Sequence, residues 1–392
     1  MDNVKKTQDF ERCTDFKIYI GCNACKRREL DSLLVKKYLL VNNYSVVDDL
    51  HTANVVIFFT CSFSEEMSTD SYRRIKYYQE NFEFVFVCGC FPVIGMHELV
   101  SDSSIITIKN DSLREIENYF PPRVLAFDKV KDGNEIYYDS TFDGNVFLIR
   151  ISSGCYGNCS YCAIKKVIGG HKSKPLSSII EEVEFAISHN CSYIRLVADD
   201  GGGYGIDMGL NIINLLERIC KCKKIKGIDF EISPKWILKY REEFEKFIKE
   251  NTRLKYKITI PIQSYSQEVL KHMGREFDVR DFKRVLINLK VNRDTDIFFV
   301  THIITGYPIE TLANQLETID FLESHIFNQV NVFPFTLHPK SPIAQSYMKT
   351  DVDVQQRTDY FVRRLCDSGY VVLESSMSES NQWGHAILRL NS

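Results

Sequence analysis

The chain has 392 residues, of which 44% are hydrophobic and 26% are charged, and its formal net charge is −3. The length allows two domains, and the composition is typical of a globular protein. No run of 18 apolar residues occurs, so we expect no membrane-spanning helix, and residues 1–10 lack the apolar stretch of a signal peptide. The slightly acidic charge argues against a protein that binds bulk RNA. We therefore expect a cytoplasmic protein that does not act at a membrane.

Residues 14–125 are predicted to form a first domain in which strands and helices alternate. Three runs rich in β-branched and aromatic residues predict strands, and two segments with helical apolar spacing predict helices between them. In chain order these are strand 16–21, helix 30–41, strand 55–60, helix 64–80 and strand 84–88. This order predicts a small, mostly parallel sheet with helices on both faces.

A cysteine follows each of the three predicted strands: Cys25, Cys61 and Cys90. In a parallel α/β sheet, functional groups collect at the carboxyl ends of the strands, so these thiols indicate one shared site. Three separate structural thiols remain the alternative. Cys88 lies inside the last strand, where we expect it to pack as a small apolar residue. The 13 cysteines of the chain are an odd number, and without a signal peptide they indicate metal ligands or free thiols.

Residues 126–144 carry Asp-Gly pairs and many polar residues, which predict a linker with a short hairpin. Residues 145–345 again alternate strands and helices, and about six β/α units predict a partial (β/α)6 barrel. The expected strands are 145–151, 193–197, 227–232, 257–261, 296–304 and 329–334. Residues 346–392 are expected to form a short C-terminal segment, with too few strand-like runs to close a barrel of its own.

The most informative stretch is the loop that holds Cys155, Cys159 and Cys162, spaced C-x3-C-x2-C. Three thiolates on one short loop can hold three irons of a [4Fe–4S] cube and leave the fourth iron open. No fourth cysteine follows before Cys191 to close the cube. Chance proximity of apolar thiols is the alternative, but the loop contains flexible glycines and stands between a predicted strand and a helix. A zinc site would more often show paired Cys-x2-Cys sets.

This loop resembles the signature of radical S-adenosylmethionine (SAM) enzymes. The resemblance implies that the open iron binds SAM and that one electron cleaves SAM to a 5′-deoxyadenosyl radical, which abstracts hydrogen from an unactivated carbon. Tyr161 matches the aromatic position that contacts adenine in the family, although an ordinary core or loop tyrosine is the alternative. Gly201 and Gly202 have no side chain and so allow close approach of the cofactor, or they form a plain flexible turn.

The span from about residue 16 to residue 345 resembles, more narrowly, the methylthiotransferases that modify tRNA or a ribosomal protein. The resemblance rests on short motifs distributed along the whole span. They are Cys25 before Asp31-Ser32, Thr60-Cys61-Ser62, Gly89-Cys90, Tyr204–Asp207, Pro261–Ser264, Met273–Arg275 and Ile304–Thr311. The last motif contains Gly306, which we assign to the cofactor site on this resemblance.

The resemblance implies two [4Fe–4S] clusters. Cys155, Cys159 and Cys162 would ligate the SAM-binding cluster. Cys25, Cys61 and Cys90 would ligate an auxiliary cluster, whose open iron holds the sulfur or methylthio group. Two SAM molecules would then be used per turnover, one to methylate the sulfur and one to activate the substrate carbon, giving a C–S–CH3 product.

Cys22 is a rival for Cys25, because Gly21-Cys22 mimics the Gly-Cys dipeptide of the family. The distance to Asp31-Ser32 favours Cys25. Other positions also depart from the family pattern: Arg28 replaces an Asn, and His338 replaces an Arg.

The family's small C-terminal β-barrel, which grips the macromolecular substrate, is expected to be absent or reduced here. Together with the acidic charge, this favours a peptide or protein side chain as substrate, including the precursor of a ribosomally made natural product, over a tRNA adenosine. Sulfur insertion or thioether formation by the same radical, and a non-catalytic iron–sulfur sensor, are further alternatives. A flavodoxin- or ferredoxin-type electron donor is the expected small partner.

Overall fold

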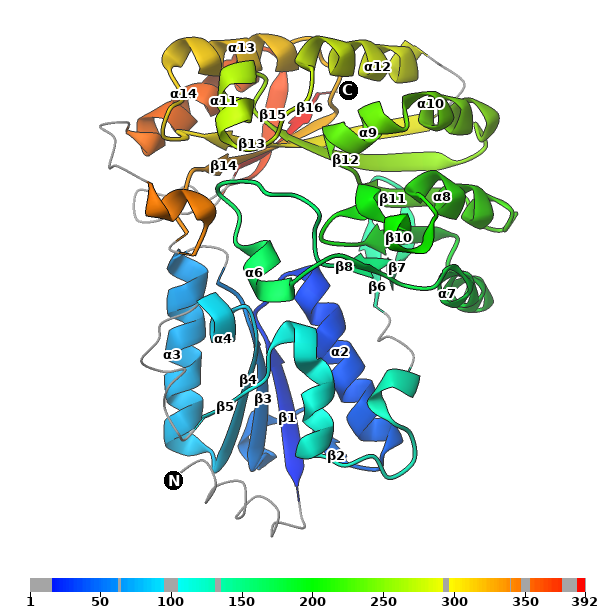
Figure 1. Ribbon diagram of the computed structural model, residues 1–392, viewed down its shortest axis with the longest axis vertical. Coiled ribbons are helices and arrows are strands. Elements are labelled where there is room, and N and C mark those ends of the chain that lie inside the picture. The colour runs from blue at the N-terminus through cyan, green and yellow to red at the C-terminus, as the bar shows by residue number, and fades with distance from the viewer. Residues whose placement is uncertain are drawn as a thin grey trace. The chain divides into compact units, whose positions relative to one another are not determined.

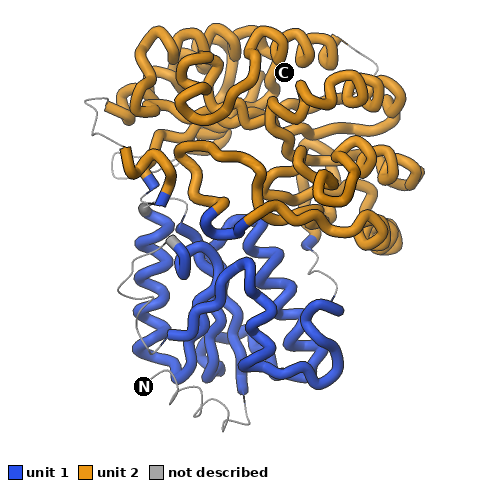
Figure 2. Tube along the Cα trace, in the orientation of Figure 1, with its two compact units in different colours: residues 1–135, 166–169, 338–340 blue, residues 136–165, 170–337, 341–392 orange. Residues whose placement is uncertain are grey.

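The computed structural model describes residues 16–62, 65–94, 105–130, 135–291, 296–338, 340–346, 353–375 and 386–391 (Figure 1). The chain divides into two compact units (Figure 2). Unit 1 comprises residues 1–135, 166–169 and 338–340, and unit 2 comprises residues 136–165, 170–337 and 341–392. The predicted segments include residues outside the described ranges, at positions 14–15, 63–64, 95–104, 131–134, 292–295, 339, 347–352, 376–385 and 392.

Unit 1 contains a sheet of five parallel strands in the order β2-β1-β3-β4-β5. The strands are β1 (Lys17–Cys22), β2 (Ser45–Val47), β3 (Val55–Thr60), β4 (Phe84–Gly89) and β5 (Ile105–Thr107). The three strands predicted from the sequence are β1, β3 and β4, and they lie side by side at the centre of the sheet. This confirms the predicted parallel α/β fold of the N-terminal part.

Both faces of this sheet are buried, which is why β3 and β4 have continuous apolar sequences. Alternate residues such as Ile57 pack against Val35 and Leu39 of α2 (Lys26–Val41), on one face. The residues between them, such as Phe58, pack against Ile75 of α3 (Glu65–Asn81), on the other. Further helical segments among the described residues of unit 1 are η1 (Leu50–Thr52), α4 (Phe91–Ile94), η2 (Asn110–Asn118) and η3 (Phe127–Lys129).

Unit 2 contains a nine-stranded sheet in the order β15-β16-β14-β13-β12-β11-β10-β7-β6. Six consecutive strands are parallel, as the partial barrel required: β7 (Gly144–Arg150), β10 (Tyr193–Val197), β11 (Gly227–Glu231), β12 (Lys255–Gln263), β13 (Asp296–Thr305) and β14 (Gln329–Pro334). An antiparallel strand, β6 (Ile136–Asp139), pairs with β7 at one edge. The short strands β8 (Ser152–Ser153) and β9 (Lys172–Ser173) form a separate pair.

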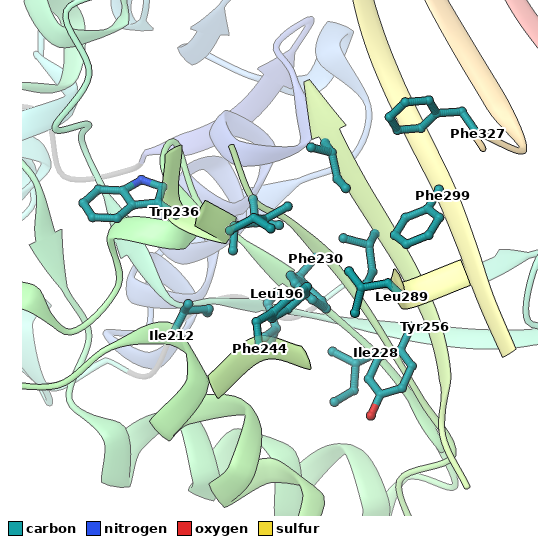
Figure 3. Packing of buried hydrophobic residues seen from close by; sticks show 14 of the residues in the cluster. Leu196, Ile212, Ile228, Phe230, Trp236, Phe244, Tyr256, Leu289, Phe299 and Phe327 are labelled. Carbon is teal, nitrogen blue, oxygen red and sulfur yellow. The ribbon is translucent and has the colours of Figure 1, made fainter. Parts of the chain in front are cut away.

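Helices connect these strands and cover one face of the sheet. They are α7 (Leu176–Ser188), α8 (Ile212–Cys220), α9 (Pro234–Lys239), α10 (Arg241–Glu250), α11 (Gln267–His272), α12 (Val279–Val291) and α13 (Leu312–Leu322), with short 3-10 turns η4 (Gly201–Gly203), η5 (Ile206–Met208) and η6 (Pro342–Gln345). Helix α6 (Ile164–Ile168) follows the cysteine loop, and its residues 166–168 belong to unit 1. Apolar side chains of strands and helices meet in one core, where Phe230 of β11 lies near Phe244 of α10 (Figure 3). No helix in the described ranges is long and apolar enough to span a bilayer.

The C-terminal segment, predicted as a short tail, continues the sheet of unit 2. After α14 (Val354–Asp367), strands β15 (Tyr370–Ser375) and β16 (Ala386–Leu390) pair antiparallel with each other, and β16 pairs with β14. The buried Tyr370 hydroxyl donates to the Phe327 carbonyl at 2.8 Å and so fixes the start of β15 to the body of the unit.

Candidate functional site

The cysteine loop, residues 155–162, lies just after the carboxyl end of β7, as the sequence predicted. A turn between α11 and α12 supports it. The N–H of Ser160 donates to the Met273 carbonyl at 2.9 Å. Gly274 has a φ of +67°, and a β-carbon there would stand 2.9 Å from the carbonyl oxygen of Asn158. Only glycine combines this conformation with such close approach, so a residue with a side chain at position 274 would push the turn away from the cysteine loop.

Two sulfur atoms of the loop face the same small space. A β-carbon on Gly157 would stand 3.1 Å from Cys155 Sγ and 3.8 Å from Cys159 Sγ. The N–H of Gly157 donates to Cys155 Sγ at 3.1 Å. Burial, and after it the nearby Asp200 carboxylate, raises the pKa of the Cys155 thiol to about 12. Loss of this proton therefore requires a local cation, which a metal centre supplies.

The other two loop sulfurs also receive an N–H. Arg275 Nη1 donates to Cys159 Sγ at 3.5 Å, and the Ile164 N–H donates to Cys162 Sγ at 3.5 Å. Each of the three sulfurs thus has a donor directed at it, and such hydrogen bonds are part of the environment that tunes iron–sulfur clusters. The three cysteines and their surroundings fit a [4Fe–4S] cluster.

A cavity of about 330 Å³ opens beside Cys155 and Cys159. Its wall carries both carboxylates and cationic side chains, so it offers partners to the ammonium and to the carboxylate of an amino acid. These charged residues are Asp199, Asp200, Glu231, Glu276, Lys235 and Arg275. The cavity is therefore suited to a small polar ligand next to the cysteine loop.

Asp200 organises the wall of this cavity. It is 8% exposed, and its Oδ1 accepts the indole N–H of Trp236 at 2.7 Å. Its Oδ2 accepts the N–H of Tyr156 at 3.3 Å and lies 3.8 Å from Lys235 Nζ. The same oxygen is 3.6 Å from Cys155 Sγ. One carboxylate thus joins the cysteine loop to the start of α9.

Gly201 and Gly202 were predicted to approach the cofactor, and the structure gives them a role in packing. A β-carbon on Gly201 would stand 2.3 Å from the Glu231 carbonyl oxygen, and one on Gly202 would stand 2.4 Å from the Trp236 ring. Both residues must therefore be glycine for η4 to pack on β11 and α9. Gly201 also lies in the cavity wall.

Tyr161 and Gly306 lie outside the described lining of the cavity. The Tyr161 hydroxyl accepts an N–H of Arg275 at 3.4 Å, and burial raises its pKa, so it is a neutral phenol. Gly306 follows β13 with a φ of +71°, and its N–H donates to Glu310 Oε2 at 2.7 Å. Their assignments to adenine and cofactor binding stay predictions.

In unit 1, Asn23 connects two of the cysteine-bearing loops. Its N–H donates to the Phe59 carbonyl at 3.1 Å, and its Oδ1 accepts the N–H of Cys61 at 3.0 Å. The N–H of Cys90 donates to the Thr60 carbonyl at 3.1 Å. The segments that follow β1, β3 and β4 are therefore hydrogen-bonded to one another along one edge of the sheet, where the sequence placed the three thiols.

The three predicted auxiliary ligands differ in exposure. Cys25 directly precedes α2 and is exposed, whereas Cys61 and Cys90 are buried. Within the described part of the chain, no three His, Cys, Asp or Glu side chains converge on a point where they would hold one metal ion. A [4Fe–4S] cube gives each thiolate its own iron, so its ligands need not converge in this way. Thiols on three adjoining loops fit such a cluster.

Sequence reasoning missed several residues that shape these sites. Arg275 belongs to the Met273–Arg275 motif, but nothing in the sequence indicates that its side chain contacts Cys159. Asp200 follows a predicted strand, which is a usable but weak signal. His338 was noted only as a departure, yet its Nε2–H donates to the Ser62 carbonyl at 2.9 Å, next to Cys61.

Comparison with known proteins gives two family matches. Residues 149–322 match the radical SAM superfamily, and residues 17–108 match the uncharacterized protein family UPF0004. The chain is 27% identical over 370 residues to the ribosomal protein uS12 methylthiotransferase RimO of Acetivibrio thermocellus, covering 88% of this chain and 80% of that protein. It is 28% identical over 338 residues to the threonylcarbamoyladenosine tRNA methylthiotransferase MtaB of Thermotoga maritima, covering 82% and 75%.

Solved structures also share the fold. The radical SAM methyltransferase TsrM of Kitasatospora setae, with cobalamin and a [4Fe–4S] cluster bound, superimposes with a TM-score of 0.61 over 84% of this chain and 77% of that one. Its sequence identity is 13%, so this likeness concerns the fold alone. The two-part arrangement of a parallel α/β domain followed by a partial barrel is therefore shared with known proteins.

Proposed function

The chain belongs to the radical SAM methylthiotransferase family, and from this premise we propose that it attaches a methylthio group to an unactivated carbon of a peptide or protein side chain. SAM and [4Fe–4S] clusters are the cofactors of the family. When bound, they supply radical chemistry for hydrogen abstraction and the sulfur that is transferred.

One observation carries the proposal: each unit has its predicted set of three cysteines just after parallel strands, after β7 in unit 2 and after β1, β3 and β4 in unit 1. In unit 2 they lie on one loop, where every sulfur receives an N–H. In unit 1 they lie on three adjoining loops that hydrogen bonds connect. A radical generator needs only one such set, so the second set supports a reaction that also delivers sulfur.

The side chains of unit 2 have defined tasks in this proposal. Cys155, Cys159 and Cys162 hold the SAM-binding cluster, and the N–H donors stabilise the negative charge on their sulfurs. Asp200, fixed by Trp236, keeps the cavity wall in place beside the loop. The cavity beside Cys155 and Cys159 positions the small ligand next to the cysteine loop.

The preference for a peptide or protein substrate is supported by charge and architecture. The net charge is −3, whereas RNA-binding proteins usually carry a basic surface. The described C-terminal strands continue the sheet of unit 2. Of the two relatives named above, one acts on a ribosomal protein and the other on tRNA. A tRNA adenosine is therefore the second candidate, and a flavodoxin- or ferredoxin-type donor completes the proposal.

Iron analysis tests the cofactor assignment. Anaerobically reconstituted protein should contain about eight irons per chain, as two four-iron clusters. Replacing all three cysteines of either set with alanine should remove about half of this iron, with loss of the SAM-dependent release of 5′-deoxyadenosine only for the loop set. Unchanged iron after Cys25→Ala, Cys61→Ala and Cys90→Ala combined would overturn the auxiliary site.

Mass spectrometry tests the reaction and the substrate. The reconstituted protein, SAM and a reductant are incubated with peptide pools and, separately, with tRNA. A mass gain matching SCH3 in a peptide supports the proposal, and the same gain in tRNA selects the second candidate. A gain of sulfur alone, or a loss of two hydrogens, indicates sulfur insertion or thioether formation. No release of 5′-deoxyadenosine in any mixture indicates a non-catalytic sensor.

A further inference from the structure

A fourth cysteine lies at the same sheet edge as the three auxiliary ligands. Cys22 is the last residue of β1 and stands opposite Phe59 of the neighbouring strand β3. The next residue, Asn23, binds both the Phe59 carbonyl and the N–H of Cys61. The backbone at Cys22 therefore lies alongside the segment that leads into Cys61, and Cys25 follows it by one short turn.

The side chain of Cys22 is directed toward α2, the helix that Cys25 precedes. Side chains alternate along a strand, so Cys22 shares the face of Ile18, which packs against Val35 and Leu39 of that helix. The surroundings of the thiol agree. Cys22 is exposed overall, but partial burial of its thiol is the largest effect that raises its pKa, and Glu29 and the Cys25 thiol add to it, while the Ala24 N–H and the Ser32 hydroxyl lower it.

Two thiols, those of Cys22 and Cys25, lie next to the proposed auxiliary cluster site. Cys22 and Cys25 are separated by two residues, Cys22 at the end of β1 and Cys25 directly before α2. Both are exposed, whereas Cys61 and Cys90 are buried. An exposed thiol at the rim of a cluster site can leave and return without disturbing the core, which a buried ligand cannot do.

We propose that Cys22 is a fourth cysteine ligand of the auxiliary cluster, bound at the iron that Cys25, Cys61 and Cys90 leave open, and that a small thiolate displaces it. The inference rests on the proposed function. In the exchange, the Fe–S bond to Cys22 breaks and an Fe–S bond to the incoming sulfur forms. The incoming thiol gives up its proton, the released Cys22 thiolate takes one up, and no electron is transferred.

The consequence is an auxiliary cluster that is closed at rest. Four thiolates satisfy all four irons of a cube, as in ordinary ferredoxins. Hydrosulfide or methanethiolate must then compete with Cys22, which is held nearby by its own strand and so acts at a high effective concentration. The site would load sulfur only when a sulfur donor is abundant, and it would keep its open iron away from other ligands.

Methanethiolate binding tests this inference in full-length protein in which Cys155, Cys159 and Cys162 are replaced with alanine, so that only the auxiliary cluster remains. The electron paramagnetic resonance spectrum of the reduced cluster is followed as sodium methanethiolate is added. Cys22→Ala should bind methanethiolate at a concentration at least about tenfold lower than the parent, because the competing thiolate is gone. Cys22→Ser provides a second variant of nearly the same size.

Cys88→Ala is the matched control, because Cys88 lies on the same face of the sheet but is buried inside β4. It should titrate as the parent does. Equal titrations for the parent and both Cys22 variants would overturn the inference, as would loss of the cluster in Cys22→Ala with retention in Cys25→Ala. If the background protein holds no cluster at all, the auxiliary site of the proposed function fails instead, and the inference fails with it.

Discussion

At the scale of single residues, Arg275 connects the cysteine loop to the barrel. Its Nη1 contacts both Cys159 Sγ and the Tyr161 hydroxyl, and its Nη2 donates to the Pro261 carbonyl. A guanidinium presents its donors in a rigid fork, so one side chain fixes all three positions. A positive, hydrogen-bonding group next to a cluster sulfur also favours the reduced, more negative cluster.

Replacing this arginine should therefore make the proposed SAM-binding cluster harder to reduce. In Arg275→Met, the reduction potential should become more negative, and each fall of about 60 mV lowers the reduced-to-oxidised ratio tenfold at a fixed donor potential. Potentiometric titration followed by electron paramagnetic resonance measures the shift. Arg280→Met, an exposed arginine on α12, is the control. A potential equal to that of the parent would show that the contact with Cys159 has no electronic effect.

Glu310 is a buried carboxyl group that makes stability depend on pH. It is 4% exposed, and burial raises its pKa to about 7, although the Gly306 N–H and Arg357 act in the opposite direction. The folded protein therefore keeps a proton that the unfolded chain releases near pH 4.5. Stability from this group is fully present below pH 4.5, declines as the pH rises, and is lost above about pH 7.

Over this range the free energy of unfolding should fall by about 3 kcal/mol through Glu310 alone. Glu310→Gln keeps an acceptor for the Gly306 N–H but cannot titrate, so its stability should change less between these two pH values. Urea unfolding of the cluster-free protein, followed by tryptophan fluorescence, measures the free energy of unfolding of the parent and of the variant at each pH. Glu217→Gln, at an exposed position of α8, should behave like the parent. Parallel pH profiles for the parent and Glu310→Gln would contradict the assignment.

At the scale of elements, η4 shows how a glycine turn shapes the cavity. Gly201 and Gly202 press against the Glu231 carbonyl and the Trp236 ring, so the turn has no room for a side chain. The same turn carries Asp200, whose carboxylate binds Trp236. The position of the cavity wall thus depends on close packing between η4, β11 and α9.

Gly201→Ala should disturb this packing, because its β-carbon would stand 2.3 Å from a backbone oxygen. We expect a loss of about 1–3 kcal/mol in stability, typical of overpacking, together with weaker SAM binding. Thermal unfolding and calorimetric titration with SAM measure the two effects. Gly170→Ala is the matched control, since no atom lies within 4 Å of its added β-carbon. Equal behaviour of both variants would remove η4 from the SAM site.

Element prediction succeeded where burial is strong. Strands β3 and β4 were predicted almost to the residue because they are buried on both faces and so carry unbroken apolar runs. Strands β2 and β5 have only three residues each, and β15 is exposed along most of its length. Such edge strands lack a regular pattern of apolar residues in the sequence. They are strands only because they pair with a neighbouring strand, which the sequence does not show.

At the scale of the whole molecule, the chain returns to unit 1 after completing the parallel strands of unit 2. Residues 338–340 belong to unit 1, where His338 Nδ1 accepts the Lys340 N–H at 3.1 Å and Nε2–H donates to the Ser62 carbonyl. This pair of bonds defines the tautomer of the ring and holds the segment that follows Cys61. A distant part of the sequence thus supports the proposed auxiliary site.

His338→Ala should weaken the auxiliary site without affecting the loop site. Loss of one hydrogen bond of about 1 kcal/mol should reduce the iron retained at the auxiliary site under mild chelation. The measurement is iron content in the background that lacks the three loop cysteines, compared with the background that lacks Cys25, Cys61 and Cys90. His338→Gln, which can still donate an N–H, should retain more iron than alanine. Equal iron loss in both backgrounds would indicate a general effect on folding.

The sequence by itself predicted the family of this protein, its fold class and most of its secondary structure. Three thiols within eight residues on a glycine-containing loop already indicate a metal cluster, and buried parallel strands can be predicted from their continuous apolar runs. Only the tertiary structure decided which groups surround the cysteines of the two units. Arg275 reaches Cys159, Asn23 holds Cys61 beside Cys22, and His338 supports Ser62, because folding brings together residues whose separation in sequence carries no signal.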